Sequence, residues 1–343
     1  MPLYALEDLD DAWDATRSFL WPVDRSRWLR LALVVLFIGG PGANLNLFQW
    51  NVPSEGTMPV GQLPTVGPRF WAIIAVLVAV ILLFGLVFLL VGSVMNFVLV
   101  ESLRHETVAV REYWGRRWGQ GLRLFGFRIV IGLLVFGSAA VFAALFFIPI
   151  AVERGTGAVA APGAISAAAL VLLVPVIIAL AILVGLVNGF TTVFVVPIMV
   201  LEDCGVLAGW RRLWPTITAH PWQYLTYAIA GFLLSILAGI FVAIVIAISA
   251  IILLIPFGIL GVVGFVLLVT VPPLGVGVLA LVGLLFVLSI IVVAAVIQVP
   301  VMAYLRYYAL LVLGDVDAEL DLIPDRRAAI RTESEAGDGG AAS

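Results

Sequence analysis

The 93 residues between Arg212 and Arg306 contain no Asp, Glu, Lys or Arg, and this run constrains the fold more than any other feature. Two further charge-free runs cover 31 residues (70–100) and 47 residues (155–201). A helix needs about 20 apolar residues to cross a hydrocarbon core roughly 30 Å thick. Hydrophobic residues make up 63% of the chain and charged residues 11%, against about 45–50% and about 25% in soluble domains. The sequence therefore predicts an integral membrane protein.

The apolar runs are continuous and do not alternate with a period of two, so they predict helices and not a barrel. We expect an all-α polytopic transmembrane helical bundle of about six spans, at approximately 29–48, 70–100, 124–151, 164–200, 222–254 and 276–312. The first span is the weakest, because Gly39-Gly40-Pro41-Gly42 interrupts it and predicts a short or broken helix. The apolar stretch 255–275 contains prolines at both ends and predicts an interfacial or re-entrant connection, although two extra spans would preserve the same orientation.

The positions of the arginines predict which side of the membrane each end faces, because basic residues near span ends stay in the cytoplasm. All 18 basic residues are Arg, and 16 of them lie in the terminal segments and alternate connections, against Arg69 and Arg154 on the other side. This split predicts an even number of spans in the cell membrane with both termini cytoplasmic. Residues 1–28 then form a cytoplasmic acidic amphipathic segment, 29–312 the transmembrane helical domain, and 313–343 a disordered acidic tail.

Short sequence matches indicate three repeated units, at about 6–100, 101–200 and 201–312. Val196-Pro197-Ile198-Met199 recurs as Val299-Pro300-Val301-Met302, and Gln120-Gly121-Leu122 recurs at the same offset as Gln223-Tyr224-Leu225. Each unit is expected to contain an interfacial helix followed by two spans. Repeated units build central sites in transporters, and repeated hairpins also build scaffolds by packing on one another.

The cytoplasmic segments of the units combine Trp and Arg at helical spacing. Trp can lie at headgroup depth, and Arg can reach lipid phosphates from there. Such segments either anchor span ends or form a docking surface for a cytoplasmic partner. The candidate interfacial or partner-binding residues are Glu101, Trp114, Arg116, Arg117, Trp118, Glu202, Asp203, Trp210, Arg211 and Arg212.

Three acids in that set stand at the cytoplasmic ends of spans two and four. Glu101, Glu202 and Asp203 can cap the following helices and pair with Arg104, Arg116, Arg211 or Arg212. A proton or cation gate is the functional alternative for acids at this depth.

Few polar residues lie deep in the predicted spans. The candidate intramembrane polar residues are Asn96, Asn188, Thr191, Thr192 and Gln298, and hydrogen bonding between helices is their usual role. Small residues at every fourth position, Gly231 and Ser235 among them, favour close helix packing, with a pore wall as the alternative. We expect no acid or base in mid-membrane beside them, as a proton-coupled carrier would need.

No catalytic motif is found in the chain, so the sequence predicts a protein that is not an enzyme. His105-Glu106 lacks the second His of a zinc-protease helix, and two His and one Cys make a metal site improbable. We expect no cofactor, no metal and no nucleic acid. The expected partners are membrane lipids and, as a further option, a cytoplasmic or membrane protein.

Stretches 97–128 and 194–227, with the close of the last span at Val299-Pro300 and Arg306-Tyr307-Tyr308, carry a family resemblance. The chain resembles six-span prokaryotic membrane domains, including the domain fused to some glycerophosphodiester phosphodiesterases, and is most similar to haloarchaeal members of unknown function. The phosphodiesterase barrel has no counterpart in this sequence, so the resemblance implies a membrane architecture and no catalytic residue. The leading hypothesis is an organiser of membrane or partner proteins, and the alternative is a transporter or channel for a small uncharged or lipid-like solute.

Overall fold

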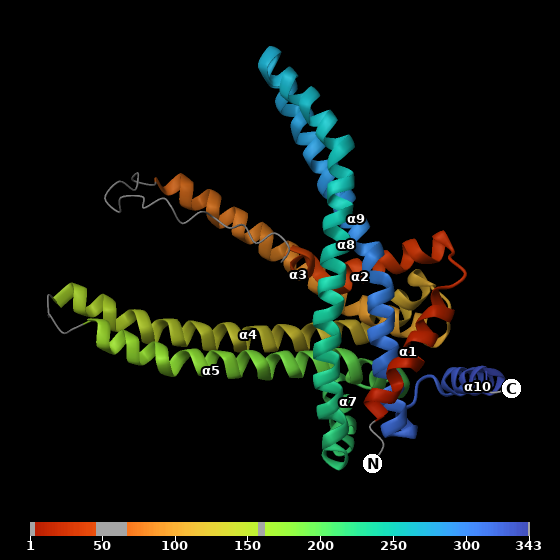
Figure 1. Cartoon of the computed structure of the whole chain (residues 1–343). Helices are drawn as coiled ribbons and strands as arrows, with labels where there is room; N and C mark the ends of the chain where they lie inside the picture. The colour runs from red at the N-terminus through yellow and green to blue at the C-terminus, as the bar shows by residue number, and fades with distance from the viewer. Residues whose placement is uncertain (1–3, 46–66, 157–161, 342–343) are drawn as a thin grey trace.

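The computed structural model describes residues 4–45, 67–156 and 162–341, and every regular element in these ranges is a helix (Figure 1). This confirms the all-helical prediction. The elements are α1 (Tyr4–Leu20), α2 (Arg25–Leu45), α3 (Pro68–Arg104), α4 (Val110–Thr156), α5 (Pro162–Phe190), the π-helix η1 (Thr191–Val195), α6 (Val196–Glu202), α7 (Val206–Ala219), α8 (Pro221–Thr270), α9 (Pro272–Val316), the 3-10 helix η2 (Ala318–Leu320) and α10 (Pro324–Ala341).

Five helical segments in the described ranges are long and apolar enough to cross a membrane, which makes the chain a membrane protein by length and composition. They are Arg69–Arg104, Val110–Phe142, Val174–Glu202, Pro221–Thr270 and Pro272–Val316. The first predicted span, at 29–48, corresponds to α2, which is not among them. This helix has 21 residues and begins with Arg25, Arg27 and Arg30, so its apolar part is short. The glycines and proline at 39–42 do not break it, because α2 continues to Leu45.

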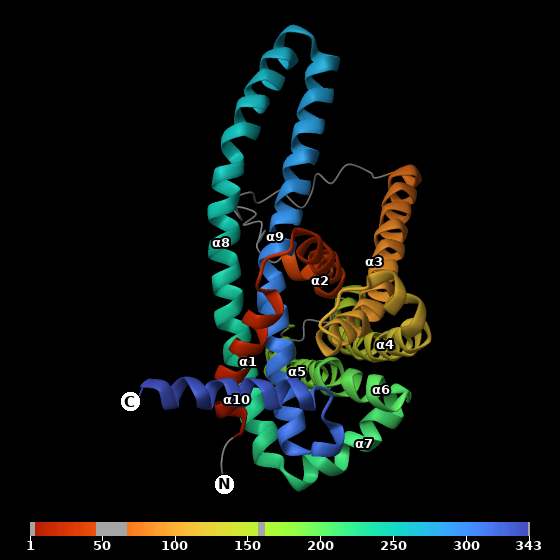
Figure 2. The same cartoon turned by 90° about the vertical axis from the view of Figure 1, so that its right-hand side faces the viewer.

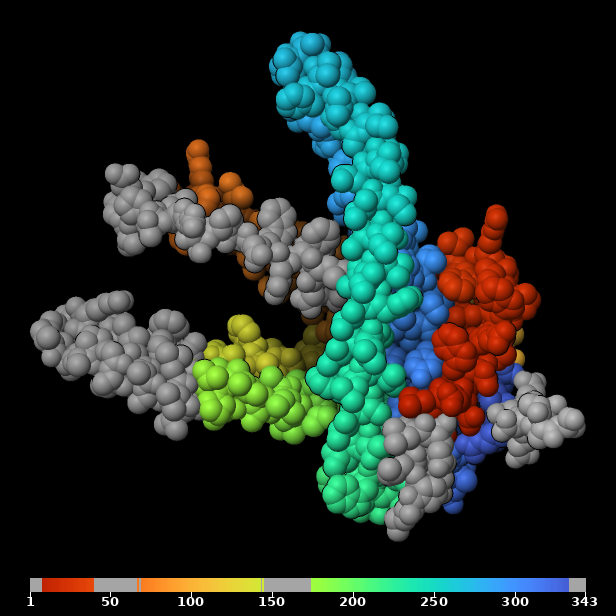
Figure 3. All heavy atoms as spheres, in the orientation of Figure 1, coloured from red at the N-terminus to blue at the C-terminus, as the bar shows by residue number. Residues whose placement is uncertain are grey.

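The long helices project from one region as arms (Figures 1 and 2). Helices α8 and α9 lie side by side along one arm, α4 and α5 form a second, and α3 forms a third. The space-filling view shows the α8/α9 arm standing clear of the α4/α5 arm on this face (Figure 3). Most side chains along the arms are exposed and apolar, as expected for surfaces that face lipid.

The core lies where the arms meet, and we call this region the junction: α1, α2, η1, α6 and the inner ends of α3, α4, α8 and α9. Phe97, Phe194, Tyr307 and Tyr308 are fully buried there. Gly121 permits the close approach of α4 to α3, because a Cβ at this position would lie 2.4 Å from Val94 Cγ2. Small residues at such contacts allow helix backbones to pack closely without a hydrophobic driving force.

The structure corrects three local predictions. Residues 255–270 continue α8 as one unbroken helix, and the chain turns at Val271 into α9. The stretch is therefore the closed end of a helical hairpin formed by α8 and α9, and not a connection outside the two helices. The interfacial segment at 110–123 is the first part of α4 and not a separate helix. The acidic tail forms α10, which its ion pairs and the buried Ile330 hold against the rest of the chain.

The three predicted units correspond to α1–α3, α4–α6 and α7–α9. The units α4–α6 and α7–α9 each contain two helical segments long enough to span a membrane, whereas α1–α3 contains two only if α2 is counted. The repeat and the six-span architecture therefore stay predictions.

Candidate functional site

A polar cluster joins the inner ends of α3, α4 and α6 and contains three of the predicted site residues, of which Glu101 and Arg117 are buried and Asp203 is exposed. The Arg117 guanidinium lies 2.5 Å from Glu101 Oε1 and 2.7 Å from Asp203 Oδ1. Gln120 Nε2 donates to Asp203 Oδ1 at 2.9 Å and to the Met199 carbonyl at 2.8 Å. Glu101 is fully buried and Arg117 nearly so. Such a pair stabilises a fold only while both charges are present.

Local backbone geometry brings the Asp203 carboxylate into this cluster. Helix α6 ends at Glu202, and Asp203 follows with φ of 52°, in the left-handed region. Asp tolerates that conformation better than most residues. The turn directs its side chain towards Arg117 and Gln120 of α4. Arg104, Arg116, Arg211 and Arg212 were the predicted partners of these acids, but Glu101 and Asp203 both pair with Arg117.

The remaining charged candidates lie at the surface. Arg212 pairs with Glu202 at 3.2 Å and with Glu319 at 2.5 Å, so the predicted Glu202–Arg212 pair is present. Arg116 and Arg211 are exposed. They remain available for a lipid or a partner.

The tryptophans divide between the interior and the surface. Trp114 and Trp210 are half-buried, and Trp210 Nε1 donates to Thr191 Oγ1 at 3.0 Å. By contrast, Trp118 is 40% exposed and Trp214 59%. Trp118 and Trp214 therefore present their rings to the surroundings of the chain.

A cavity of about 700 Å³ lies at the junction, and α2, α3, α4, α5, η1, α8 and α9 all contribute to its walls. Its polar lining comprises Asn96, Arg128, Asn188, Thr192, Tyr227, Ser235 and Arg306. Three predicted intramembrane polar residues, Asn96, Asn188 and Thr192, thus share one cavity. Thr191 is buried against Trp210, and Gln298 lies on α9 outside the cavity lining.

Two arginines within candidate spans reach this cavity from opposite helices. Arg306 of α9 donates to Asn96 Oδ1 at 2.5 Å and to the Thr192 carbonyl. Arg128 of α4 donates to Thr192 Oγ1 at 3.0 Å and to Ser93 Oγ at 3.5 Å. The π-helical turn of η1 contains Thr192, and such turns change the usual backbone pairing, often at functional sites. Asn96 and Thr192 therefore have cationic neighbours, whereas the expectation that no acid or base lies beside them in mid-membrane stays a prediction.

Glycines and a serine make room for the cavity. Gly185 and Gly189 of α5 and Gly231 and Ser235 of α8 line it. A Cβ at Gly185 or Gly189 would meet nothing within 4 Å. Close helix packing was the preferred prediction for these small residues, but in this part of α5 and α8 they leave space instead.

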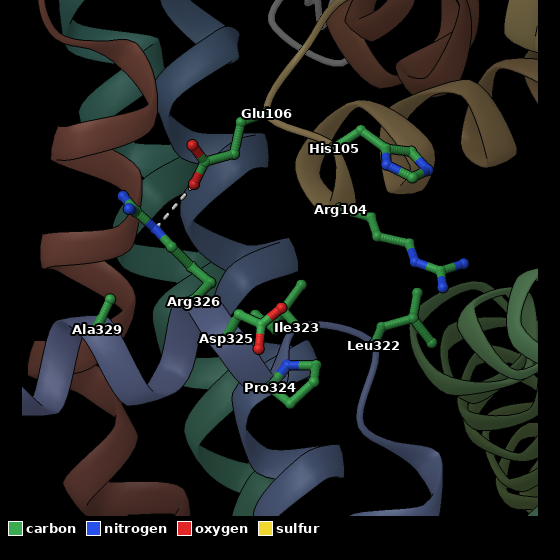
Figure 4. Close-up of a pocket in the computed structure, with 9 residues that line it drawn as sticks. All are labelled: Arg104, His105, Glu106, Leu322, Ile323, Pro324, Asp325, Arg326 and Ala329. Carbon is green, nitrogen blue, oxygen red and sulfur yellow. Dashed lines mark ion pairs between the residues drawn. The ribbon is translucent and has the colours of Figure 1, made fainter.

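A second hollow, of about 630 Å³, lies between the end of α3 and the start of α10 (Figure 4). Glu106 and Arg326 face each other across it at 3.1 Å, and His105 and Arg104 lie apart from this pair. His105 Nε2 lies 3.2 Å from Glu101 Oε2, which connects this hollow to the polar cluster.

Helix α10 is held by charges that the sequence analysis treated as solvated. Arg331 lies 3.2 Å from Asp8, 3.0 Å from Asp11 and 2.5 Å from Asp315. Asp8 is fully buried, and burial together with the neighbouring Asp315 carboxylate raises its pKa to about 8. A carboxyl group that is desolvated beside another carboxylate retains its proton.

Sequence reasoning missed Arg128 and Arg306 because both were counted as markers of span ends. Their positions carried a signal. Arg128 lies 18 residues after the start of α4 and Arg306 lies before ten further helical residues of α9. Arg306 also directly follows the 93-residue run without charge, and a cation buried beside such a run is by default a candidate for function.

No group of three or more His, Cys, Asp or Glu in the described ranges is arranged to hold a metal ion. The long apolar helices and the buried charged junction together define a multi-pass helical membrane protein. The chain belongs to a family of unknown function (DUF7544), whose profile matches residues 3–323. No curated protein and no solved structure matches it.

Proposed function

We propose that this chain is a non-catalytic multi-pass protein of the cell membrane that organises membrane lipids or a partner protein through its cytoplasmic Trp/Arg helices. In this proposal it has six spans with α2 as the sixth, three repeated units and both termini in the cytoplasm. Its acidic, lysine-free ends favour a haloarchaeal source, and the resemblance to the phosphodiesterase-linked membrane domains concerns architecture alone.

The observation that supports this function is an exposed surface on the first turns of α4 and on α7, which we call the Trp/Arg face. It consists of Arg116, Trp118, Arg211 and Trp214, all exposed. The opposite side of α7 is buried, with Leu213 and Gly209 packed into the junction. A Trp ring beside a guanidinium group suits the headgroup layer, where the ring is partly desolvated and the cation meets phosphate.

A lipid-enrichment assay tests the Trp/Arg face. The full chain is placed in nanodiscs of phosphatidylcholine with a minority of phosphatidylglycerol, and the ratio of the two lipids retained around the protein is measured. Replacing Trp118 and Trp214 with Ala and Arg116 and Arg211 with Gln should remove the enrichment of phosphatidylglycerol, because electrostatic attraction to anionic lipid contributes about 1 kcal/mol per basic residue.

The matched control is Trp71→Ala near the start of α3, at the end away from Glu101, which removes an indole that is 62% exposed. This variant should retain the enrichment. The same four-residue variant should also lose any protein captured from native membranes. Unchanged lipid ratios together with unchanged capture would contradict the proposal.

The junction cavity favours a second candidate, a transporter for an amphiphilic solute. Central cavities where repeated units meet are typical of transporters. The two arginines favour an anionic solute over the uncharged one expected from the sequence, and the apolar walls favour a lipid-like one. Flux of a fluorescent anionic lipid between leaflets of proteoliposomes would support this candidate. Its absence would exclude the transporter and favour the organising function.

A further inference from the structure

We propose that the junction cavity is a binding site for the phosphate group of an anionic membrane lipid, held between Arg128 and Arg306. This site is separate from the Trp/Arg face and stands independently of the function proposed for that face.

The charges at the cavity are unbalanced. None of the ion pairs among the described residues includes Arg128 or Arg306. The hydrogen-bond partners found for them in the same ranges are neutral: the hydroxyls of Ser93 and Thr192, the amide of Asn96 and the Thr192 carbonyl. Two desolvated guanidinium groups beside one another are costly without an anion. A phosphate group in the cavity would offset that cost for both.

Donors remain for such a group. Arg128 Nε has no hydrogen-bond partner in the described part of the chain, so protein groups do not satisfy this guanidinium fully. Each guanidinium carries five N–H donors in a fixed plane, a geometry that matches two phosphate oxygens at once. Asn96 and the η1 backbone hold the Arg306 plane in place, so the site is organised before a ligand arrives.

The walls of the cavity indicate a lipid and not a free anion. Ile182, Leu186, Phe190 and Phe232 line it beside the two arginines. Ile182 and Phe232 are also exposed on the outer surface of the helices, so the cavity reaches the surface that faces lipid. An acyl chain gains from this apolar lining, whereas inorganic phosphate gains nothing from it.

The level of the cavity along the helices also suits a headgroup. It lies where the exposed apolar arms give way to the buried junction: Ile229 and Phe232 of α8 are exposed, whereas Tyr224 and Tyr227 of the preceding turns are buried. With the termini in the cytoplasm, that level corresponds to the headgroups of the inner leaflet.

Three probes separate the possible ligands. The full chain is purified in dodecyl maltoside and stripped of lipid. Binding of dioleoylphosphatidylglycerol, dioleoylglycerol and sodium phosphate is then measured by native mass spectrometry and by the shift in Tm. We expect one tightly bound phosphatidylglycerol per chain, little binding of dioleoylglycerol, which has the same acyl chains without phosphate, and little effect of sodium phosphate.

Two variants test the two halves of the site. Arg128→Gln removes one cation, and Gly185→Leu adds a bulky side chain at the cavity wall, where a Cβ would meet nothing within 4 Å. Each should weaken phosphatidylglycerol binding about tenfold or more, as expected for one lost charge-assisted contact or a blocked cavity. The matched control is Gly239→Leu on α8, beyond the cavity residues Gly231 and Ser235, where a Cβ also meets nothing within 4 Å. It should bind as the unaltered chain does.

Each remaining outcome overturns the proposal. Equal binding of dioleoylglycerol would show that phosphate is not recognised. Sodium phosphate binding as tightly as the lipid would assign the cavity to a free anion. Retained phosphatidylglycerol binding in both Arg128→Gln and Gly185→Leu would place the lipid elsewhere. None of these results alters the test of the Trp/Arg face, which uses other residues and measures the surrounding lipid.

Discussion

The arms and the junction are built from the same helices but follow different physical rules. Along the α8/α9 arm, apolar side chains such as Leu237 and Phe232 are exposed, because lipid solvates them as well as protein would. At the junction, the same α9 buries Arg306, Tyr307 and Tyr308. In lipid the apolar arms need few contacts with each other, whereas the charged groups of the junction must find partners. Stability and specificity are therefore concentrated in the junction.

The strongest test of this contrast removes one half of the buried Glu101–Arg117 pair. Glu101→Ala leaves Arg117 buried with only part of its partner set, and loss of one member of a buried pair costs about 3–5 kcal/mol. We expect a large loss of folded protein, measured as the free energy of unfolding in a denaturing-detergent titration. The free energy of unfolding of a Glu101→Gln variant should lie between those of the unaltered chain and Glu101→Ala, since Gln keeps the hydrogen bond but not the charge. A Glu101→Ala variant as stable as the unaltered chain would show that the polar cluster does not stabilise the junction.

A pair of phenylalanine substitutions compares the two regions directly. Phe194 is fully buried at the junction, where its ring lies 4.7 Å from that of Tyr227, and Phe232 is 66% exposed on the α8 arm. Phe194→Ala should destabilise by about 3–5 kcal/mol because it leaves a cavity. Phe232→Ala should cost much less, since lipid fills the space. Equal losses in the same unfolding titration would show that the arms are packed as firmly as the junction.

The docking of α10 should depend on pH through Asp8. Burial raises the pKa of Asp8 from 3.8 to about 8, so between these values the folded state binds a proton that the unfolded state has released. Its contribution to stability is full below about pH 4 and is lost as the pH rises through about 8. The charged groups facing Asp8 are Asp11, Asp315 and Arg331.

Hydrogen exchange measures this effect on α1 and α10. Amide protection in both helices should fall as the pH rises from about 4 to about 8 in the unaltered chain and should change little above that. Asp8→Asn cannot ionise and should keep its protection over the same range. A chain whose protection is independent of pH from 6 to 9 would contradict the assignment of the proton to Asp8.

The smallest effect is expected on the arms. Leu237 is 63% exposed on α8, and Leu237→Ala should change the free energy of unfolding by less than about 0.5 kcal/mol, as for surface sites away from special features. A loss of several kcal/mol would indicate that another helix or another copy of the chain covers this face in the membrane.

The sequence alone determined the class of the protein, because charge-free runs of 31 to 93 residues can be accommodated only in lipid. It also identified Glu101, Arg117 and Asp203, since acids at span ends need partners nearby. Only the tertiary structure decided which arginine each acid meets, because pairing depends on the approach of α4 to α3 and α6. The junction cavity was equally invisible in the sequence. Asn96, Arg128, Thr192 and Arg306 lie far apart along the chain, and only the crossing of helices brings their side chains together.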